Sequence, residues 1–231
     1  CGAPGDVGDD RGTRATGQGD LPRARVVPRE IALDLSVDPD RAEFSGLAWW
    51  GDRLILLPQD PAVFGDDAGG ALLTIDRERL RRVIEDGDTT PIRPSRLPFH
   101  DGDLDTRVTG WDGYEALAVD GDQVYLAVEC RTVDGWEGLI VRGRIEGEPP
   151  RVVVDPLLRT HLAGASGTPN FSEEALVVLG EEVWSIHELN GRRVNPAPVV
   201  TRMSRQLEVL EPWPFPPIEY RVTDATSGDG A

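Results

Sequence analysis

The sequence predicts an all-β fold made of repeated hairpins, and three observations lead to this expectation. Three segments align without gaps through their first half: SGLAWWGDRLILLPQ (45–59), EALAVDGDQVYLAVE (115–129) and EALVVLGEEVWSIHE (174–188). In each segment, two apolar runs flank a glycine that is followed by an acidic residue, which is a β-hairpin pattern. Their starts lie 70 and 59 residues apart. This spacing accommodates four strands with loops and favours a β-propeller, with each unit forming one blade.

Further strands are expected after each hairpin, at 71–76 (ALLTID), 138–145 (GLIVRGRI) and 197–204 (APVVTRMS). Both faces of the second hairpin are apolar, with Leu117 on one side and Ala116 on the other. Blades stacked around an axis bury both faces, whereas a half-exposed antiparallel sheet alternates apolar with polar residues. One helical segment, DRERLRRVIEDGD (76–88), is expected as an insertion between strands that ends at Gly87.

The C-terminal stretch IEYRVTDATSGDGA (218–231) resembles the opening of a fourth unit. Asp224 stands in it where the earlier units have Glu115 and Glu174. Three blades and the start of a fourth cannot close a ring, and closure is what removes exposed sheet edges. We therefore expect either that the chain belongs to a longer protein with a six-bladed ring, or that it pairs its edges with something else.

The charge of the chain limits its partners. The 231 residues are 39% hydrophobic and carry a formal net charge of -17, so the chain can form one sizeable core but repels phosphate backbones and anionic headgroups. Nucleic-acid binding is therefore not expected. A cationic partner or a metal ion is easier to accommodate.

The N-terminus predicts processing. The chain opens on Cys1 and its only methionine is Met203. A first mature cysteine is what signal-peptide cleavage leaves in bacterial lipoproteins, and this start resembles them. The resemblance implies a lipid on Cys1 that anchors the protein in the cell envelope, on its periplasmic or extracellular face. The alternative is a chain boundary that falls on cysteine by chance.

The composition after Cys1 divides the chain into two parts. Residues 1–22 are rich in Gly and Asp and are expected to form a disordered tether, because they cannot bury enough apolar surface to fold. The propeller domain is expected over 23–231. With Cys1 lipidated, Cys130 has no partner left for a disulfide. No run of eighteen or more apolar residues occurs, so no membrane span is expected.

Acidic residues recur at the open ends of the hairpins. If the second hairpin has a three-residue loop, Glu115 lies opposite Glu129, and the same spacing puts Glu174 opposite Glu188. In the first hairpin, the uncharged residues Ser45 and Gln59 would form the equivalent facing pair. Like charges directly opposed on two strands are destabilising, so these four carboxylates would require a neutralising group.

A calcium ion is one candidate for that neutralising group. It takes about six to eight oxygen ligands from carboxylates, amides and water, which fits this cluster better than the sparse histidines do. Another interpretation is an acidic rim that is solvated or paired with Arg131, Arg192 or Arg193. A two-residue turn would shift the register and separate each pair of glutamates.

The phrases SGLAWWGDRLILL and EALAVDGDQVYLAVE resemble blade motifs of six-bladed propellers of the gluconolactonase, senescence-marker and strictosidine-synthase group. They look still more like bacterial phytase-like propellers with esterase-like activity, and the resemblance covers roughly residues 25–226. In metal-binding members, the residue before the Gly/Ala-Leu-Ala step is often a ligand of an axial divalent ion. Carried over by position, this implies Glu115, Glu174 and Asp224 as ligands, whereas Ser45 departs from the expected Asn or acid.

Other candidate sites have weaker patterns. Asp101, Asp103 and Asp105 occupy the first, third and fifth places of a calcium-loop pattern, but Thr106 stands where the sharp turn needs glycine. We interpret this stretch as an acidic surface loop. His187 is expected opposite Ala175 in a packed structural role. The chain has no GxSxG nucleophile elbow, Walker loop or dinucleotide fingerprint.

Two functional hypotheses follow. The first is a lipid-anchored envelope propeller that binds a small molecule, a glycan or a protein, with an optional structural calcium ion. The second is a divalent-metal-dependent hydrolase of a lactone, phosphoester or ester, in which the axial cation polarises the scissile group or activates water.

Overall fold

The computed structural model describes residues 28–38, 41–66, 69–133, 135–162 and 173–227. Contacts divide the chain into two units, Cys1–Glu30 and Ile31–Ala231, and the fold described below is that of the second. The tether predicted over 1–22 and the lipid site at Cys1 lie outside the described residues. Within those residues, no helix is long and apolar enough to cross a membrane.

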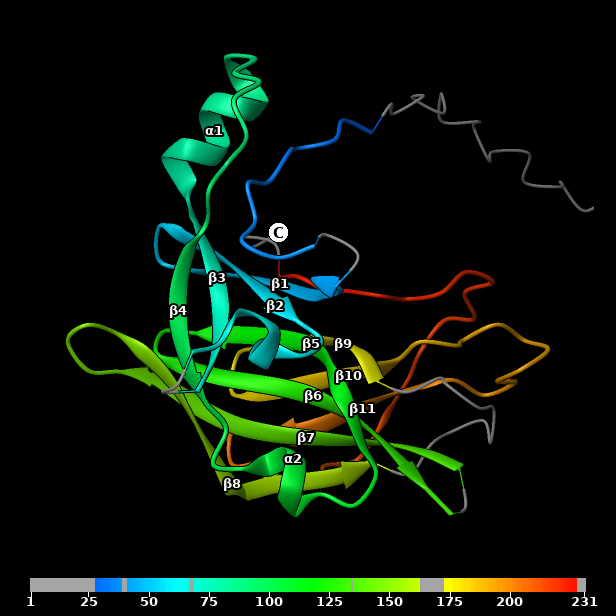
Figure 1. The fold of residues 1–231 in the computed structure, drawn as a ribbon. Helices are drawn as coiled ribbons and strands as arrows, with labels where there is room; N and C mark the ends of the chain where they lie inside the picture. The colour runs from blue at the N-terminus through cyan, green and yellow to red at the C-terminus, as the bar shows by residue number, and fades with distance from the viewer. Residues whose placement is uncertain (1–27, 39–40, 67–68, 134, 163–172, 228–231) are drawn as a thin grey trace, which may run out of the picture. The chain divides into compact units, whose positions relative to one another are not determined.

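The described strands form three antiparallel units of four (Figure 1). Blade 1 consists of β1 (Phe44–Trp50), β2 (Arg53–Pro58), β3 (Gly70–Asp76) and β4 (Ser95–His100). Blade 2 consists of β5 (Trp111–Asp120), β6 (Gln123–Thr132), β7 (Gly135–Glu146) and β8 (Arg151–Leu162). Blade 3 consists of β9 (Glu173–Leu179), β10 (Glu182–His187), β11 (Val199–Ser204) and the short β12 (Trp213–Pro214). The predicted all-β, propeller-like fold is confirmed, and the six-bladed ring stays a prediction.

Blades 1 and 2 are joined at their outer strands. β4 pairs in parallel with β8 through Phe99 with Val152 and His100 with Val153. The two blades thereby form one eight-stranded sheet in the order β1-β2-β3-β4-β8-β7-β6-β5. Because β1 also lies against β5, this sheet is nearly closed. The largest apolar core lies between the two blades, and its fully buried members include Ile55, Leu72, Leu117, Leu126 and Leu139.

Blade 3 packs on the other face of blade 2. A second core there contains Tyr125, Ile140, Leu176 and Met203. Polar contacts from the turn after β11 strengthen this interface, because the Tyr125 hydroxyl donates to the backbone oxygen of Arg205 at 3.2 Å. Blade 2 therefore has both faces covered, as the apolar pattern of its hairpin predicts.

Of the two turn lengths considered for the inner hairpins, the structure has the shorter one. Trp50 pairs with Arg53, Asp120 with Gln123 and Leu179 with Glu182, so each inner hairpin has a two-residue turn. The first turn residue is Gly51, Gly121 or Gly180, with φ between 57° and 59°. This left-handed conformation is readily adopted only by glycine, which explains the repeated Gly-acid pattern.

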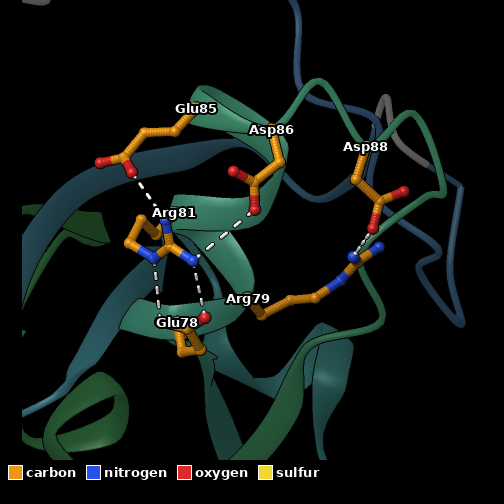
Figure 2. A network of polar contacts seen from close by, with 6 residues as sticks. All are labelled: Glu78, Arg79, Arg81, Glu85, Asp86 and Asp88. Carbon is orange, nitrogen blue, oxygen red and sulfur yellow. Dashed lines mark hydrogen bonds and ion pairs between the residues drawn. The ribbon is translucent and has the colours of Figure 1, made fainter.

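The helix α1 (Arg77–Glu85) extends from blade 1 between β3 and β4 (Figure 1). It begins and ends within the stretch predicted as helix, with Gly87 just beyond its end. Figure 2 shows how its charges are arranged: Arg81 contacts Glu78 at 3.0 Å and Glu85 at 2.7 Å, one turn away on either side. Arg79 pairs with Asp88 and also donates to the backbone oxygen of Thr90 at 2.6 Å. These contacts join the helix to the chain that returns to β4.

Candidate functional site

The inner strands of the three blades lie beside one another, β1 against β5 and β5 against β9. A cavity of about 640 Å³ opens at one end of these strands. The C-terminal segment, drawn in red, runs back toward β1 in Figure 1 and contributes to the same cavity. The polar side chains among the lining residues are Glu43, Ser45, Gln59, Glu115, Glu174, Arg221, Thr223 and Asp224.

A β-bulge occurs at the same place in each inner strand. Ser45 is skipped in the pairing of β1 with β2, Glu115 in that of β5 with β6, and Glu174 in that of β9 with β10. A bulge places an extra residue outside the regular ladder and bends the strand, which can redirect its side chain. All three bulge residues line the cavity. The repeated sequence position therefore has a shared structural role.

The bulge in blade 1 also fixes the approach of β1 to β5. The Ser45 hydroxyl donates to the backbone oxygen of Tyr114 at 2.6 Å. At the next residue, a Cβ on Gly46 would lie 3.0 Å from the backbone nitrogen of Leu117. A larger residue at 46 would therefore push the two blades apart. In this blade the bulge residue serves a contact between blades rather than a charge.

Among the carboxyl groups that line the cavity, Glu115 has the largest change in pKa. Burial raises its pKa to about 7, and the negative charges of Glu129 and Glu174 act in the same direction. The Gln59 side chain donates a hydrogen bond to Glu115 Oε1 at 2.6 Å, which opposes the shift. The group therefore exchanges its proton near neutral pH.

Glu174 and Glu188 share the guanidinium group of Arg221. The Arg221 Nη2 atom lies 3.1 Å from Glu174 Oε1, and Nε pairs with Glu188 Oε1. The Val222 backbone N–H donates to the Glu188 backbone oxygen at 3.0 Å, which holds the C-terminal segment beside the end of β10. Burial raises the pKa of Glu174, and the positive charge of Arg221 lowers it.

Asp224 reaches the same cavity from the C-terminal segment. It is exposed by surface area, yet the protein around its carboxyl still raises its pKa by partial desolvation. The N–H of Ala225 donates to Asp224 Oδ1 at 2.7 Å and opposes this shift. Ser45, Glu115, Glu174 and Asp224, the four positions aligned from the sequence, thus line one cavity.

The facing pairs of glutamates, which required three-residue turns, do not form. Because of the two-residue turn and the bulge, Glu129 pairs with Gly113, and Glu115 has no partner in the ladder. Glu188 follows the last residue of β10, beyond the paired positions. Glu129 and Glu188 are buried, but neither lines the cavity.

Two related pairings expected from the same register are also wrong, and an arginine does pair with the acids, but it is not one of those named. Ser45 does not face Gln59; the backbone N–H of Gln59 instead donates to the backbone oxygen of Glu43 at 2.8 Å. His187 pairs with Glu173, while Ala175 pairs with Ile186. The arginine beside the carboxylates of Glu174 and Glu188 is Arg221, rather than one of the three arginines named from the sequence.

Sequence reasoning missed a buried polar cluster beside the bulge of blade 3. The Ser185 hydroxyl donates to Glu173 Oε2, and burial raises the pKa of Glu173. The Leu189 backbone N–H donates to His187 Nδ1 at 3.0 Å, which places the proton of a neutral His187 ring on Nε2. The sequence signal for this cluster was the doubled acid in SEEA. That signal was insufficient, because the sequence does not show that Glu173 is buried.

Among the described residues, no group of three or more His, Cys, Asp and Glu side chains could hold a metal ion. Two of the candidates, Glu174 and Glu188, are paired with Arg221. In the acidic loop, Asp101 Oδ1 instead accepts the backbone N–H of Asp103 at 3.1 Å. The calcium ion stays a prediction.

No family model matches the chain, and no curated protein matches it. The resemblance to phytase-like propellers therefore stays a prediction, and the function is argued from the cavity itself.

Proposed function

We propose that this protein is a binding domain that takes a positively charged small ligand in the cavity lined by Glu115, Glu174 and Asp224. The observation that carries the proposal is the gathering of these three carboxylates, from three successive units, in one cavity. All three have raised pKa values. Burial is the first cause of each shift, and a bound cation would favour the ionised forms of these partly desolvated carboxyls, as Arg221 already does for Glu174.

The protonation of Glu115 gives this binding a characteristic signature. With a pKa of about 7, a fraction of the molecules carry a neutral Glu115 at neutral pH. A cation stabilises the ionised carboxylate, so its binding should release protons from Glu115. Uptake of a neutral or anionic ligand would not have this effect.

Calorimetric titration at pH 7 with agmatine, spermidine and Ca²⁺ tests the proposal, with glucose and citrate as neutral and anionic comparisons. We expect a cation to bind with proton release, detected by comparing buffers of different ionisation enthalpy. Glu115→Gln and Asp224→Asn should each weaken binding about tenfold, the effect of losing roughly 1.4 kcal/mol. Glu208→Gln changes an exposed acid outside the cavity and is the matched control. Equal binding by all variants, or no cation binding at all, would contradict the proposal.

Metal-dependent hydrolysis is a second candidate function. One observation favours it: a carboxyl group with a pKa of about 7 in a cavity is suited to proton transfer near neutral pH. Turnover of an ester, lactone or phosphoester that requires both added Ca²⁺ and Glu115 would favour hydrolysis over simple binding. Binding without turnover would leave the first proposal.

We also propose that the domain is held in the bacterial cell envelope by a lipid on Cys1, on the strength of the N-terminal sequence. Mass spectrometry of the N-terminal peptide from the native host is expected to show a diacylglyceryl group on Cys1. Cys1→Ser should move the protein from the membrane fraction to the soluble fraction. An unmodified Cys1 in membrane-associated protein would contradict this anchor.

A further inference from the structure

We propose that Arg221 is a built-in occupant of a guanidinium subsite formed by Glu174 and Glu188, and that the ligand of the cavity carries a guanidinium group which displaces it. This inference rests on the proposed function, because it names the ligand class of the same cavity. It also predicts that Arg221 must leave the subsite before such a ligand can bind there.

The geometry of the contact matches a planar cation. Two different nitrogens of one guanidinium, Nη2 and Nε, contact the carboxylates of Glu174, at the bulge of blade 3, and Glu188, just after β10. An Arg side chain presents such N–H groups in a fixed fork, whereas an ammonium group is a single point of charge. The subsite therefore favours guanidinium over lysine-like amines.

The three side chains joined by these ion pairs differ in burial. The Glu188 side chain has no exposed surface, the Glu174 side chain is 17% exposed and the Arg221 side chain is 55% exposed. The carboxylates are fixed by the blade, while the cation is reached from solvent. Arg221 belongs to a segment outside the regular strands. An external cation can therefore compete with Arg221 without disturbing the sheet.

Glu188 also keeps capacity for a second donor. Its two carboxylate oxygens, Oε1 and Oε2, are buried and have no hydrogen-bond partner among the described residues. Arg221 Nε forms an ion pair with Oε1. A free guanidinium compound is not tied to the backbone of residue 221, so it can place two parallel N–H groups on both oxygens of one carboxylate. Such a ligand can donate to both buried oxygens of Glu188 at once.

Chemical rescue of a variant that lacks the side chain tests the subsite. Arg221→Ala leaves buried Glu188 without its cation, so we expect a melting temperature lower by roughly 5–10 °C at pH 7. Millimolar methylguanidinium should restore most of this loss, whereas equal concentrations of ammonium or sodium should not. Arg193→Ala removes an exposed arginine close in sequence and should show neither the loss nor the rescue. In the double variant Arg221→Ala/Glu188→Gln, the rescue should disappear.

Competition is measured on the same proteins. Because Arg221 occupies the subsite in the wild type, methylguanidinium should bind Arg221→Ala at least tenfold more tightly than the wild type. In the wild type, agmatine should increase hydrogen exchange of the backbone amides at 218–222. Arg221→Ala that is unaffected by methylguanidinium, or wild-type amides at 218–222 that do not respond to bound agmatine, would overturn the inference. Rescue by Ca²⁺ in place of methylguanidinium would also overturn it and would assign the subsite to a divalent ion.

A second variant is used if Arg221→Ala does not fold. Arg221→Lys keeps the positive charge but lacks the guanidinium, so the backbone amides at 218–222 should exchange faster than in the wild type. Unchanged exchange would contradict the subsite.

Two outcomes separate this inference from the proposed function. If the wild type binds no cation but Arg221→Ala is rescued, the proposed function and the displacement of Arg221 by a cavity ligand both fail, while Glu174 and Glu188 stand as a guanidinium subsite. If cations bind with Glu115-dependent proton release but Arg221 does not respond, only the present inference fails.

Discussion

Glu115→Gln is expected to stabilise the protein by about 2 kcal/mol at pH 8, while weakening cation binding. The ordinary glutamate pKa of 4.5 applies to the unfolded chain, and the folded value is about 7. Between these values the folded state binds more protons than the unfolded state, so stability falls as pH rises from about 4.5 to 7. Each pKa unit corresponds to about 1.4 kcal/mol, and the partial exposure of Glu115 reduces the total. Glutamine has no proton to lose and removes this penalty.

Urea unfolding between pH 4.5 and pH 8 measures this effect. The wild type should lose stability across the interval, and Glu115→Gln should lose clearly less. The two proteins should become similar near pH 4.5, where Glu115 is protonated in the folded state. Glu208→Gln, at an exposed position, should follow the wild type. Parallel curves for the wild type and Glu115→Gln would show that Glu115 keeps an ordinary pKa in solution.

Gly110→Ala is expected to lower the free energy of unfolding by about 3 kcal/mol or more, because it has the closest Cβ contact among the glycines that the structure describes. A Cβ at this position would lie 1.8 Å from the backbone oxygen of Arg131. The neighbouring backbone cannot yield easily, because the N–H of Arg131 donates to the Gly110 oxygen at 2.6 Å. Gly110 also has φ of 74°, which strains any L-residue with a side chain.

Gly121→Ala separates the two causes. Gly121 has φ of 57°, but a Cβ there would meet nothing within 4 Å. Its loss should be limited to the left-handed backbone, about 1 kcal/mol. The difference between the two variants in thermal and urea unfolding measures the clash with Arg131. Equal losses would mean that the chain around Gly110 relaxes to admit the methyl group.

The repeat and its turn glycines were sufficient to predict the blades. Apolar runs on either side of Gly121 specify two strands, and burial on both faces follows from their composition. The turn length could not be read, because glycine followed by an acid suits both two-residue and three-residue turns. This difference of one residue in the turn determines whether Glu115 faces Glu129. The bulge was equally hidden, since it depends on hydrogen bonding between strands and not on the local pattern.

The acidic character of the cavity was partly predictable. Alignment of the repeats brought Glu115, Glu174 and Asp224 to equivalent positions, and they do line one cavity. Arg221 gave no sequence signal, because its pairing with Glu174 and Glu188 depends on the path of the C-terminal segment through space. The parallel contact between β4 and β8 was unpredictable for the same reason. Both features arise between segments that are far apart along the chain.

The recurring bulge lets a side chain in the cavity change without changing the pairing of the strands that carry it. Residues 45, 115 and 174 stand outside the ladder hydrogen bonds of their hairpins, so their side chains can differ while the strands keep their pairing. Blade 1 carries a hydroxyl there and the other two carry carboxylates. Repeated units of this kind can acquire new ligand preferences one side chain at a time. Substitutions at positions 115 and 174 could therefore vary the charge of the cavity while the strand pairing is kept.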